Sequence, residues 1–129
     1  IKDCGGSPAK TQALIADGRL AVLAGEDAQM FTTLALGGTG AIAASAHWQA
    51  PQFVELVALL RRGQLAEARH VWQALLPWVE MCFAEPNPAP LKAVLAKAGW
   101  MRNELRAPMM PASEALLQRL QALPGFSRP

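Results

Sequence analysis

Charged residues are scarce in this sequence. Only 17% of the 129 residues are Asp, Glu, Lys or Arg, whereas 52% are hydrophobic, and soluble domains usually carry ~25% charged residues. A chain this apolar can form a core, so the composition excludes intrinsic disorder. Twelve basic and ten acidic residues leave a formal net charge of +2, and the basic residues are scattered. Because no basic stripe is present, we expect no nucleic acid partner.

Cysteine is nearly absent as well. Cys4 and Cys82 cannot build a disulfide framework, and no C-x-x-C spacing that would suggest a metal site is present. Two free thiols indicate a reducing, cytoplasmic compartment. The glycines of residues 37–40 lack the G-K-[ST] ending of a phosphate loop and lie between a helix and the following strand, which is the wrong order. We therefore expect a tight turn at residues 37–40. Without metal-ligand spacing or a phosphate loop, we expect the protein to bind neither a metal nor a cofactor.

Residues 28–54 contain no charged side chain, and this stretch is longer than the ~20 residues that cross a bilayer. Three glycines and Pro51 would interrupt a helix there, and lipid would not satisfy the polar side chains between them. We therefore expect no membrane span. No positively charged leader precedes an apolar run, so we expect no targeting segment, and we expect the chain to be a piece of a longer protein.

The first 63 residues alternate short apolar segments with helical patterns. Strands are predicted over residues 1–3, 20–23 and 41–44, and each is followed by a helix. This alternation is typical of parallel strands joined by crossover helices, and it predicts the α/β class. Three parallel strands cannot close into a barrel and leave an unpaired edge. We therefore expect further strands from upstream in a longer chain, or from another copy or fragment.

The later part of the sequence is predicted to be helical. An apolar stripe with the α-helical period covers residues 65–83, and Pro77 should kink this helix rather than end it. The final helix is predicted to begin after the cap Ser113. We therefore divide the chain into residues 1–63, with three β/α units, and residues 64–129, a helical extension.

Lys2 lies at the end of the first predicted strand. The carboxyl ends of parallel strands are where α/β folds place reacting groups. A lysine at such a place is usually a solvated strand end, so its position alone does not make it a nucleophile. Inside an apolar interior, however, a neutral lysine amine can attack a ketone carbon. The period of two places Ile1 and Asp3 on the opposite face.

Three other polar positions each have two interpretations. Gly25-Glu26-Asp27 offers an approachable backbone and carboxylates for a polar substrate, although such a turn more often caps a helix. His47 is either an acid or base near neutral pH or a hydrogen-bonded loop residue. Cys4 would share the face of Lys2 if the strand continued, but a small buried side chain is the commoner role.

Five segments, taken together in this order and spacing, resemble one protein family. They are Ile1-Lys2-Asp3, Gly25-Glu26-Asp27, residues 40–46, residues 83–92 and residues 104–109, and the Glu-Pro-Asn-Pro stretch from Glu85 is the most specific marker. The sequence resembles dihydrodipicolinate synthase, within the group that includes N-acetylneuraminate lyase. The similarity covers the carboxyl half of that family's chain.

The resemblance implies the carboxyl-terminal part of a TIM (β/α)8 barrel, with its last three parallel strands, followed by a helical extension. Lys2 matches the lysine that forms a Schiff base with pyruvate, and the enamine then attacks an aldehyde, aspartate semialdehyde in lysine biosynthesis. Ile42 matches a position whose backbone lies near the bound pyruvate, and Gly25 matches a glycine that lines the pocket. The resemblance also implies self-association as a homotetramer or homodimer.

The sequence departs from the family at several positions. Cys4-Gly5-Gly6 replaces the commoner Ala-Thr-Gly, and His47 replaces a common asparagine, which changes contacts around the aldehyde. The chain has no tyrosine, whereas the family uses a tyrosine hydroxyl as a proton relay and paired threonines for the pyruvate carboxylate. Both belong to the first half of the family's chain, so we expect this chain alone to be inactive. Two alternatives remain: a sugar-acid aldolase resembling N-acetylneuraminate lyase, and a non-catalytic half-barrel that serves as an assembly module.

Overall fold

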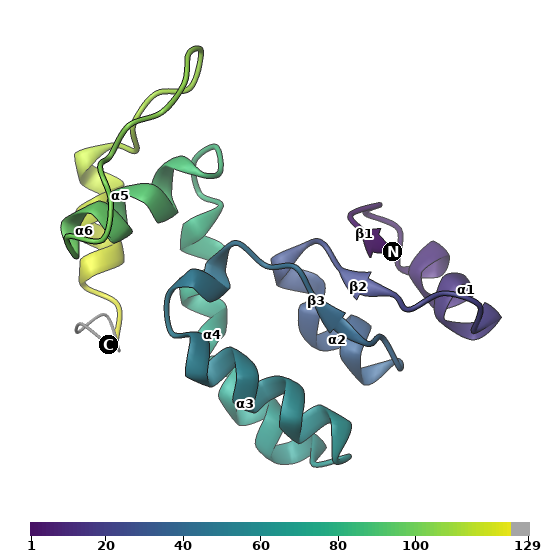
Figure 1. Ribbon diagram of the computed structural model, residues 1–129. Coiled ribbons are helices and arrows are strands. Elements are labelled where there is room, and N and C mark those ends of the chain that lie inside the picture. The colour runs from purple at the N-terminus through teal and green to yellow at the C-terminus, as the bar shows by residue number, and fades with distance from the viewer. Residues whose placement is uncertain (125–129) are drawn as a thin grey trace. The chain divides into compact units, whose positions relative to one another are not determined.

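The computed structural model describes residues 1–124, and they form two compact units (Figure 1). The first unit combines residues 1–43 with residues 50–75. The second contains residues 44–49 and the described residues from 76 onward. The predicted division of the chain at residue 63 refers to a complete barrel and stays a prediction.

A parallel three-stranded sheet forms the centre of the first unit. Its strands are β1 (Lys2–Asp3), β2 (Leu23–Ala24) and β3 (Gly40–Ala41), in the order β1-β2-β3. Lys2 pairs with Leu23, which in turn pairs with Gly40. The predicted parallel arrangement is therefore present, with shorter strands than the apolar segments suggested.

Helix α1 (Pro8–Asp17) follows β1, as the alternation of strands and helices predicts. The Ser7 side chain accepts a hydrogen bond from the backbone N–H of Lys10, proline occupies the first turn, and Gly18 ends the helix with φ +72°. These features match the usual start and stop signals of helices. The apolar residues of α1 stay at least partly exposed, and its one buried residue is Thr11.

The segment after β2 begins with a 3-10 turn, whereas the sequence pattern predicts an α-helix. A 3-10 turn, η1 (Asp27–Gln29), precedes helix α2 (Met30–Ala35). Helix α2 contacts β2 and β3 and buries Met30 and Leu34. Gly37, with φ +103°, then turns the chain into β3, and the N–H of Gly38 donates to the carbonyl oxygen of Thr33 over 2.8 Å. The glycines of residues 37–40 thus form the predicted tight turn.

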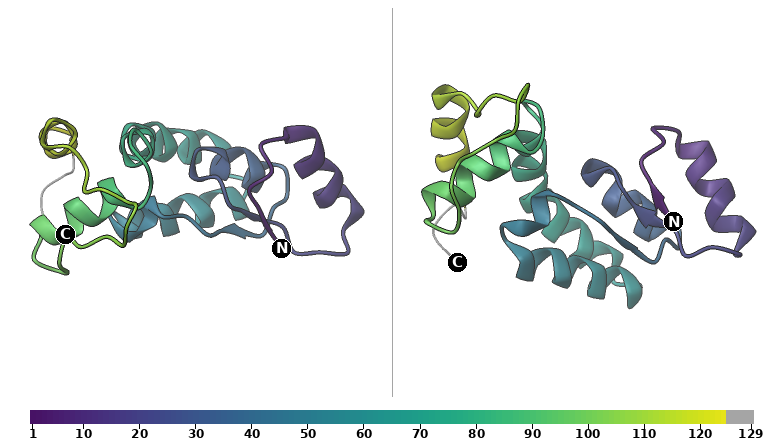
Figure 2. Two further views of the ribbon diagram at one scale, coloured as in Figure 1. Left: turned by 90° about the horizontal axis from the view of Figure 1, so that it is seen from above. Right: turned by 45° about the horizontal axis from the view of Figure 1, so that its top comes forward.

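The two faces of the sheet have different surroundings. On one face, Asp3 and Ala24 are buried, and Asp3 bonds to Thr11 of helix α1. Helices α1 and α2 lie beside the strands (Figure 2, left). On the other face Lys2 is exposed. The helices therefore cover one side of the sheet and leave the side of Lys2 accessible.

A helical hairpin completes the first unit. Helix α3 (Ala50–Arg61) buries Phe53, Leu56 and Leu59, and Gly63 turns the chain into α4 (Leu65–Cys82). The hairpin is visible in both views of Figure 2. Helix α4 continues through Pro77, as predicted.

Indole rings form much of the core of the second unit. Trp48 and Trp78 are buried, with ring centroids 6.4 Å apart, and the ring of the exposed Trp100 lies 5.4 Å from that of Trp48. The indole N–H of Trp78 donates to the carbonyl oxygen of Ser45 over 2.9 Å. This bond links the end of α4 to the 3-10 turn η2 (Ser45–His47).

Two further helices, α5 (Ala89–Lys97) and α6 (Glu114–Gln121), pack together in the second unit. The Ser113 hydroxyl accepts a hydrogen bond from the N–H of Leu116 over 3.1 Å, which confirms the predicted cap of α6. Leu116 and Leu120 face the core. These buried leucines give the short helix α6 one apolar face.

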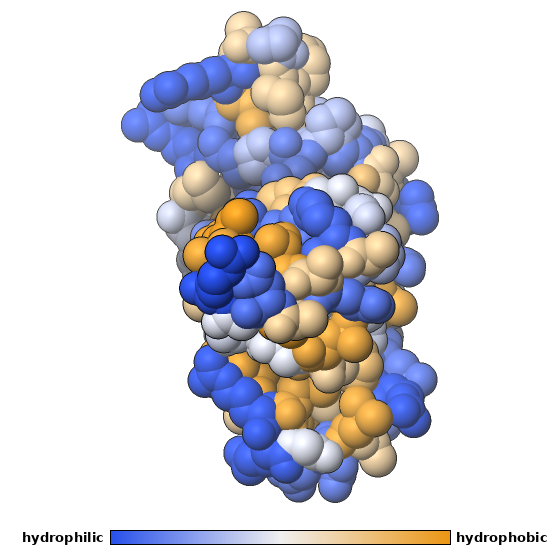
Figure 3. Space-filling view, turned by 90° about the vertical axis from the view of Figure 1, so that its right-hand side faces the viewer, coloured by the Kyte–Doolittle hydropathy of each residue, from blue (hydrophilic) through white to orange (hydrophobic). Residues whose placement is uncertain are grey.

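Apolar side chains also remain accessible. Figure 3 shows hydrophobic patches among hydrophilic ones on one face of the molecule. Exposed large apolar side chains in the first unit include Ile1, Leu20, Ile42 and Val54. Within residues 1–124, no helix combines the length and the apolar character that crossing a membrane requires.

Candidate active site at the carboxyl ends of the strands

The three residues that the sequence marks as a site lie on one face of the sheet. Backbone hydrogen bonds from Gly25 N to Asp3 O and from Ile42 N to Ala24 O, both 2.9 Å long, continue the ladders past the strands. They align Cys4, Gly25 and Ile42 in one row. This row follows the Lys2 row by two residues, so both rows face the same side.

Gly25 lies directly against the side chain of Lys2. A Cβ at position 25 would stand 2.9 Å from Cε of Lys2 and 2.9 Å from the carbonyl oxygen of Asp3, and it would overlap Sγ of Cys4. Atoms this close leave no room for a side chain, so only glycine fits here without a shift of its neighbours. The structure therefore brings Lys2, Cys4 and Gly25 together.

Ile42 lies at the far side of the row. It follows β3, two strands away from Lys2, and neighbouring strands are about 4.8 Å apart. Its side chain is 50% exposed. Ile42 thus shares the face of Lys2, but β2 lies between their two strands.

The carboxylate of Asp3 occupies the opposite, covered face. Its side chain is only 4% exposed and forms an ion pair with Lys10 Nζ at 2.5 Å. It also accepts hydrogen bonds from the Thr11 hydroxyl at 2.6 Å and from the N–H of Gly5 at 3.1 Å. The hydrogen bonds from Lys10 and Thr11 hold the pKa of Asp3 below its ordinary value of 3.8.

The other polar candidates have less specific surroundings. His47 is exposed, and its Nδ1 lies 2.9 Å from the carbonyl oxygen of Ala44, which fits the interpretation as a hydrogen-bonded loop residue. Glu26 precedes η1 without a side-chain capping bond, whereas Asp27 is buried in its first turn. Cys4 is exposed, so the expectation of a small buried side chain is wrong. Lys2 and Ile42, on the same face of the sheet, are exposed as well.

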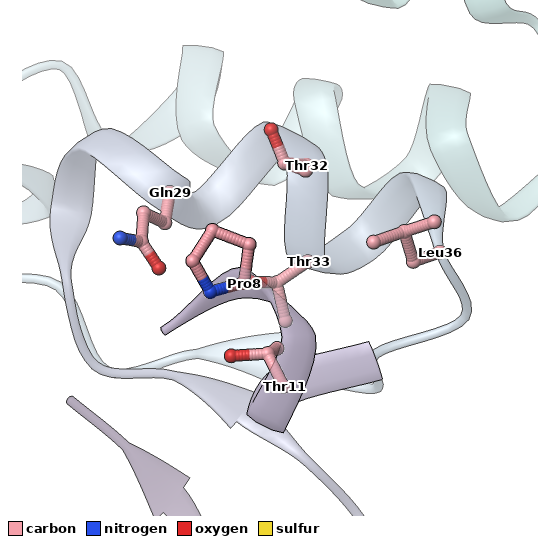
Figure 4. Close-up of a pocket in the computed structure, with 6 residues that line it drawn as sticks. All are labelled: Pro8, Thr11, Gln29, Thr32, Thr33 and Leu36. Atoms are coloured by element: carbon pink, nitrogen blue, oxygen red, sulfur yellow. The ribbon is translucent and has the colours of Figure 1, made fainter. Parts of the chain in front are cut away.

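Sequence reasoning missed Lys10 and Thr11 as partners of Asp3. Thr11 lies on α1 and faces the same small pocket as Thr33 on α2 (Figure 4). A threonine among the apolar residues of α1 was the available signal, but the sequence does not show which strand residue it meets. Within residues 1–124, no group of three or more potential metal ligands is present.

The sequence matches one family of known proteins over nearly its whole length. A family model described as the Dihydrodipicolinate synthetase family matches residues 1–123. The 4-hydroxy-tetrahydrodipicolinate synthase 2 of Clostridium acetobutylicum is 37% identical over 123 residues, which cover 93% of this chain and 43% of that protein. The 4-hydroxy-tetrahydrodipicolinate synthase of Thermotoga petrophila is 40% identical over 100 residues, which cover 78% of this chain and 34% of that protein.

Solved structures agree with the sequence comparison. The dihydrodipicolinate synthase of Thermotoga maritima superposes with a TM-score of 0.89 at 34% identity, covering 95% of this chain and 43% of that one. The enzyme of Acinetobacter baumannii, solved with pyruvate, superposes with a TM-score of 0.87 at 27% identity, covering 94% of this chain and 42% of that one. The chain thus spans less than half the length of the relatives it matches, and its three strands are part of an α/β barrel. It belongs to the dihydrodipicolinate synthetase family.

Proposed function

We propose that this chain is the carboxyl-terminal portion of a class I pyruvate aldolase, a 4-hydroxy-tetrahydrodipicolinate synthase that condenses pyruvate with aspartate semialdehyde in lysine biosynthesis. One observation carries the proposal: Lys2, in the two-residue strand β1, lies on the exposed face of the sheet, and its side chain lies against the bare backbone of Gly25. In a closed barrel, the face opposite the helices is the interior. The side chain of Lys2 then points into the space where substrates bind.

The proposed reaction begins with the ε-amine of Lys2. The amine attacks C2 of pyruvate, and loss of water from the resulting carbinolamine forms an imine. Removal of a proton from C3 gives an enamine, whose C3 then attacks the aldehyde carbon of aspartate semialdehyde. Hydrolysis or transimination finally releases the product and regenerates the amine. The imine serves as the electron sink for this carbon–carbon bond formation.

Gly25 and Ile42 are the proposed substrate-binding residues. Gly25 has no side chain, so a small keto acid can approach Lys2 closely at this point. The N–H of Ile42 is already used in a hydrogen bond to Ala24, so its backbone contribution to pyruvate binding would come from its carbonyl group or from contact. Neither residue supplies a proton, and the tyrosine that the family uses for proton transfer is absent from this chain.

The names of the relatives favour the synthase over a sugar-acid aldolase. The synthases of Clostridium acetobutylicum and Thermotoga petrophila carry the same activity in their names. A sugar-acid aldolase resembling N-acetylneuraminate lyase would use the same lysine and differ in the aldehyde pocket. A non-catalytic half-barrel would keep the fold but form no adduct with pyruvate.

We propose a cytoplasmic location and self-association as a homotetramer or homodimer. Two free cysteines, one of them exposed, are consistent with a reducing compartment. The exposed apolar side chains are consistent with a surface that other parts of the protein cover. Light scattering on the complete barrel would distinguish a tetramer from a dimer, and a monomer would contradict the proposal of self-association.

The function is tested by turnover of the complete barrel with pyruvate and aspartate semialdehyde. We expect Lys2→Ala to abolish turnover, because the reaction needs the amine, and to leave the far-ultraviolet circular dichroism spectrum unchanged. Full activity of Lys2→Ala would contradict the proposal. Turnover with a sugar acid but not with aspartate semialdehyde would favour the lyase alternative, and no turnover with either would favour the assembly module.

A further inference from the structure

The buried carboxylate of Asp3 has no part in the proposed reaction, yet it is adjacent to Lys2 in the chain. Its two oxygens bind three groups from two different segments. Oδ1 meets Lys10 Nζ and the N–H of Gly5, whereas Oδ2 accepts from the Thr11 hydroxyl. These bonds tie the end of β1 to helix α1 and to the turn that follows the strand.

The same residue is also fixed through its backbone. Asp3 pairs with Ala24 in the sheet, and its carbonyl oxygen accepts a hydrogen bond from Gly25 N. The backbone on both sides of the Asp3 side chain is therefore held: Lys2 before it and Cys4 after it. Because strand side chains alternate, anchoring Asp3 on the covered face sets Lys2 on the open face.

The contacts around Gly25 show how closely this arrangement fits. Cε of Lys2, Sγ of Cys4 and the carbonyl oxygen of Asp3 all crowd the same point above Gly25. A small rotation of the strand end would move all three atoms together. The position of the Lys2 side chain therefore depends on the bonds that hold Asp3.

The geometry points to Asp3 as a positioning residue that, through its bonds to Thr11 and Lys10, holds the ε-amine of Lys2 in place for attack on the keto acid. This inference rests on the proposed function. Asp3, Thr11 and Lys10 lie on the other side of the sheet from the substrate. They would affect the reaction only through the position of Lys2. A misplacement of about 1 Å at a reacting group can lower a rate by about 100-fold.

Thr11 and Thr33 provide a matched pair of variants. Both are buried threonines of the first unit that line the same pocket, and only the Thr11 hydroxyl bonds to Asp3 (Figure 4). Thr11→Val and Thr33→Val make the same chemical change in the same surroundings. Asp3→Asn is a third variant, which keeps the size of the side chain and removes its charge.

The experiment measures how fast the complete barrel forms the pyruvate adduct that borohydride traps on Lys2, as a function of pyruvate concentration. We expect Thr11→Val and Asp3→Asn to lower the rate at saturating pyruvate by between about tenfold and 100-fold. The half-saturating pyruvate concentration should change little, because the pocket itself is unaltered. Thr33→Val should stay within about twofold of the unsubstituted protein.

Unfolding in urea is recorded in parallel, and rates are compared only where each variant is fully folded. If all fully folded variants form the adduct at the same rate, Asp3 has only a structural role. That result would overturn the inference. An equal loss in Thr11→Val and Thr33→Val would overturn it as well. If the unsubstituted protein forms an adduct and Asp3→Asn does not slow it, only the positioning role fails. If the unsubstituted protein forms no adduct on Lys2, the proposed function fails too.

Discussion

Gly25 and Lys2 lie so close that a Cβ on residue 25 would stand 2.9 Å from Cε of the lysine. The two residues belong to neighbouring strand ends, 23 positions apart in the chain. The sequence marks each of them separately, through a resemblance, whereas the sheet register brings them together. This contact explains why a residue without a side chain is needed beside the proposed nucleophile.

The first prediction concerns Gly25→Ala. The new methyl group would collide with Sγ of Cys4 and would press on the carbonyl oxygen of Asp3, which is backbone and cannot move freely. Overpacking of this kind destabilises proteins by about 1–3 kcal/mol. We expect a loss of this size in urea unfolding, together with slower adduct formation at Lys2. Unchanged stability and an unchanged rate would show that the strand ends can move apart.

The second prediction concerns the acid stability that Asp3 provides. Its folded-state pKa is lowered by the hydrogen bonds from Lys10 and Thr11. A carboxyl group with a lowered pKa stabilises the fold above its ordinary value of 3.8, and this contribution is lost as the pH falls through the lowered pKa. We therefore expect Asp3→Asn to be less stable than the unsubstituted protein at neutral pH. The difference between the two urea midpoints should shrink below about pH 3.8. A difference that stays constant down to pH 2 would contradict the assignment.

The third prediction concerns the cap of helix α6. The Ser113 hydroxyl accepts from Leu116 N, and the Ser113 N–H donates to Glu85 over 2.9 Å. Loss of an N-cap typically destabilises a protein by about 1 kcal/mol. We expect this loss for Ser113→Ala, and a much smaller one for Ser113→Thr, because threonine keeps the hydroxyl. The measurement is thermal unfolding of both variants, and equal melting temperatures would argue against the cap.

The fourth prediction concerns the indole N–H of Trp78. Trp78→Phe keeps a buried aromatic ring but removes the donor to Ser45. We expect a loss of about 1–3 kcal/mol in urea unfolding, because a buried hydrogen-bond partner is removed. Trp100→Phe is the matched control, since Trp100 is 55% exposed and makes a ring contact with Trp48. Equal effects of the two substitutions would mean that ring size, and not the hydrogen bond, stabilises this unit.

Local signals in the sequence predicted the helices well. Ser113 caps α6 as expected, and α4 continues through Pro77 because tertiary packing outweighs the loss of one backbone bond. The strands were predicted less accurately. The second strand was expected over residues 20–23, but β2 covers Leu23–Ala24. A strand forms only where a partner strand lies opposite, and a sequence pattern does not show the length of that partner.

The sequence predicted the residues of the candidate site, but not the hydrogen bonds that hold Asp3 beside it. Lys2, Gly25 and Ile42 came from the resemblance, and the sheet places them on one face. The alternation of side chains along the strand predicted that Cys4 shares the face of Lys2, and the structure confirms it. The bond between Asp3 and Thr11 depends on how α1 packs against β1. The sequence pattern does not show this packing, because a turn in which Gly6 has φ +61° joins β1 to α1.

The central claim is that Lys2 captures pyruvate covalently, and peptide mapping tests it most directly. The complete barrel is mixed with pyruvate, reduced with borohydride and digested, and the modified lysine is identified by mass spectrometry. Lys10 serves as an internal control, because it lies nearby but its amine pairs with Asp3. We expect the adduct on Lys2 and none on Lys10. An adduct on any other lysine, or no adduct at all, would contradict it.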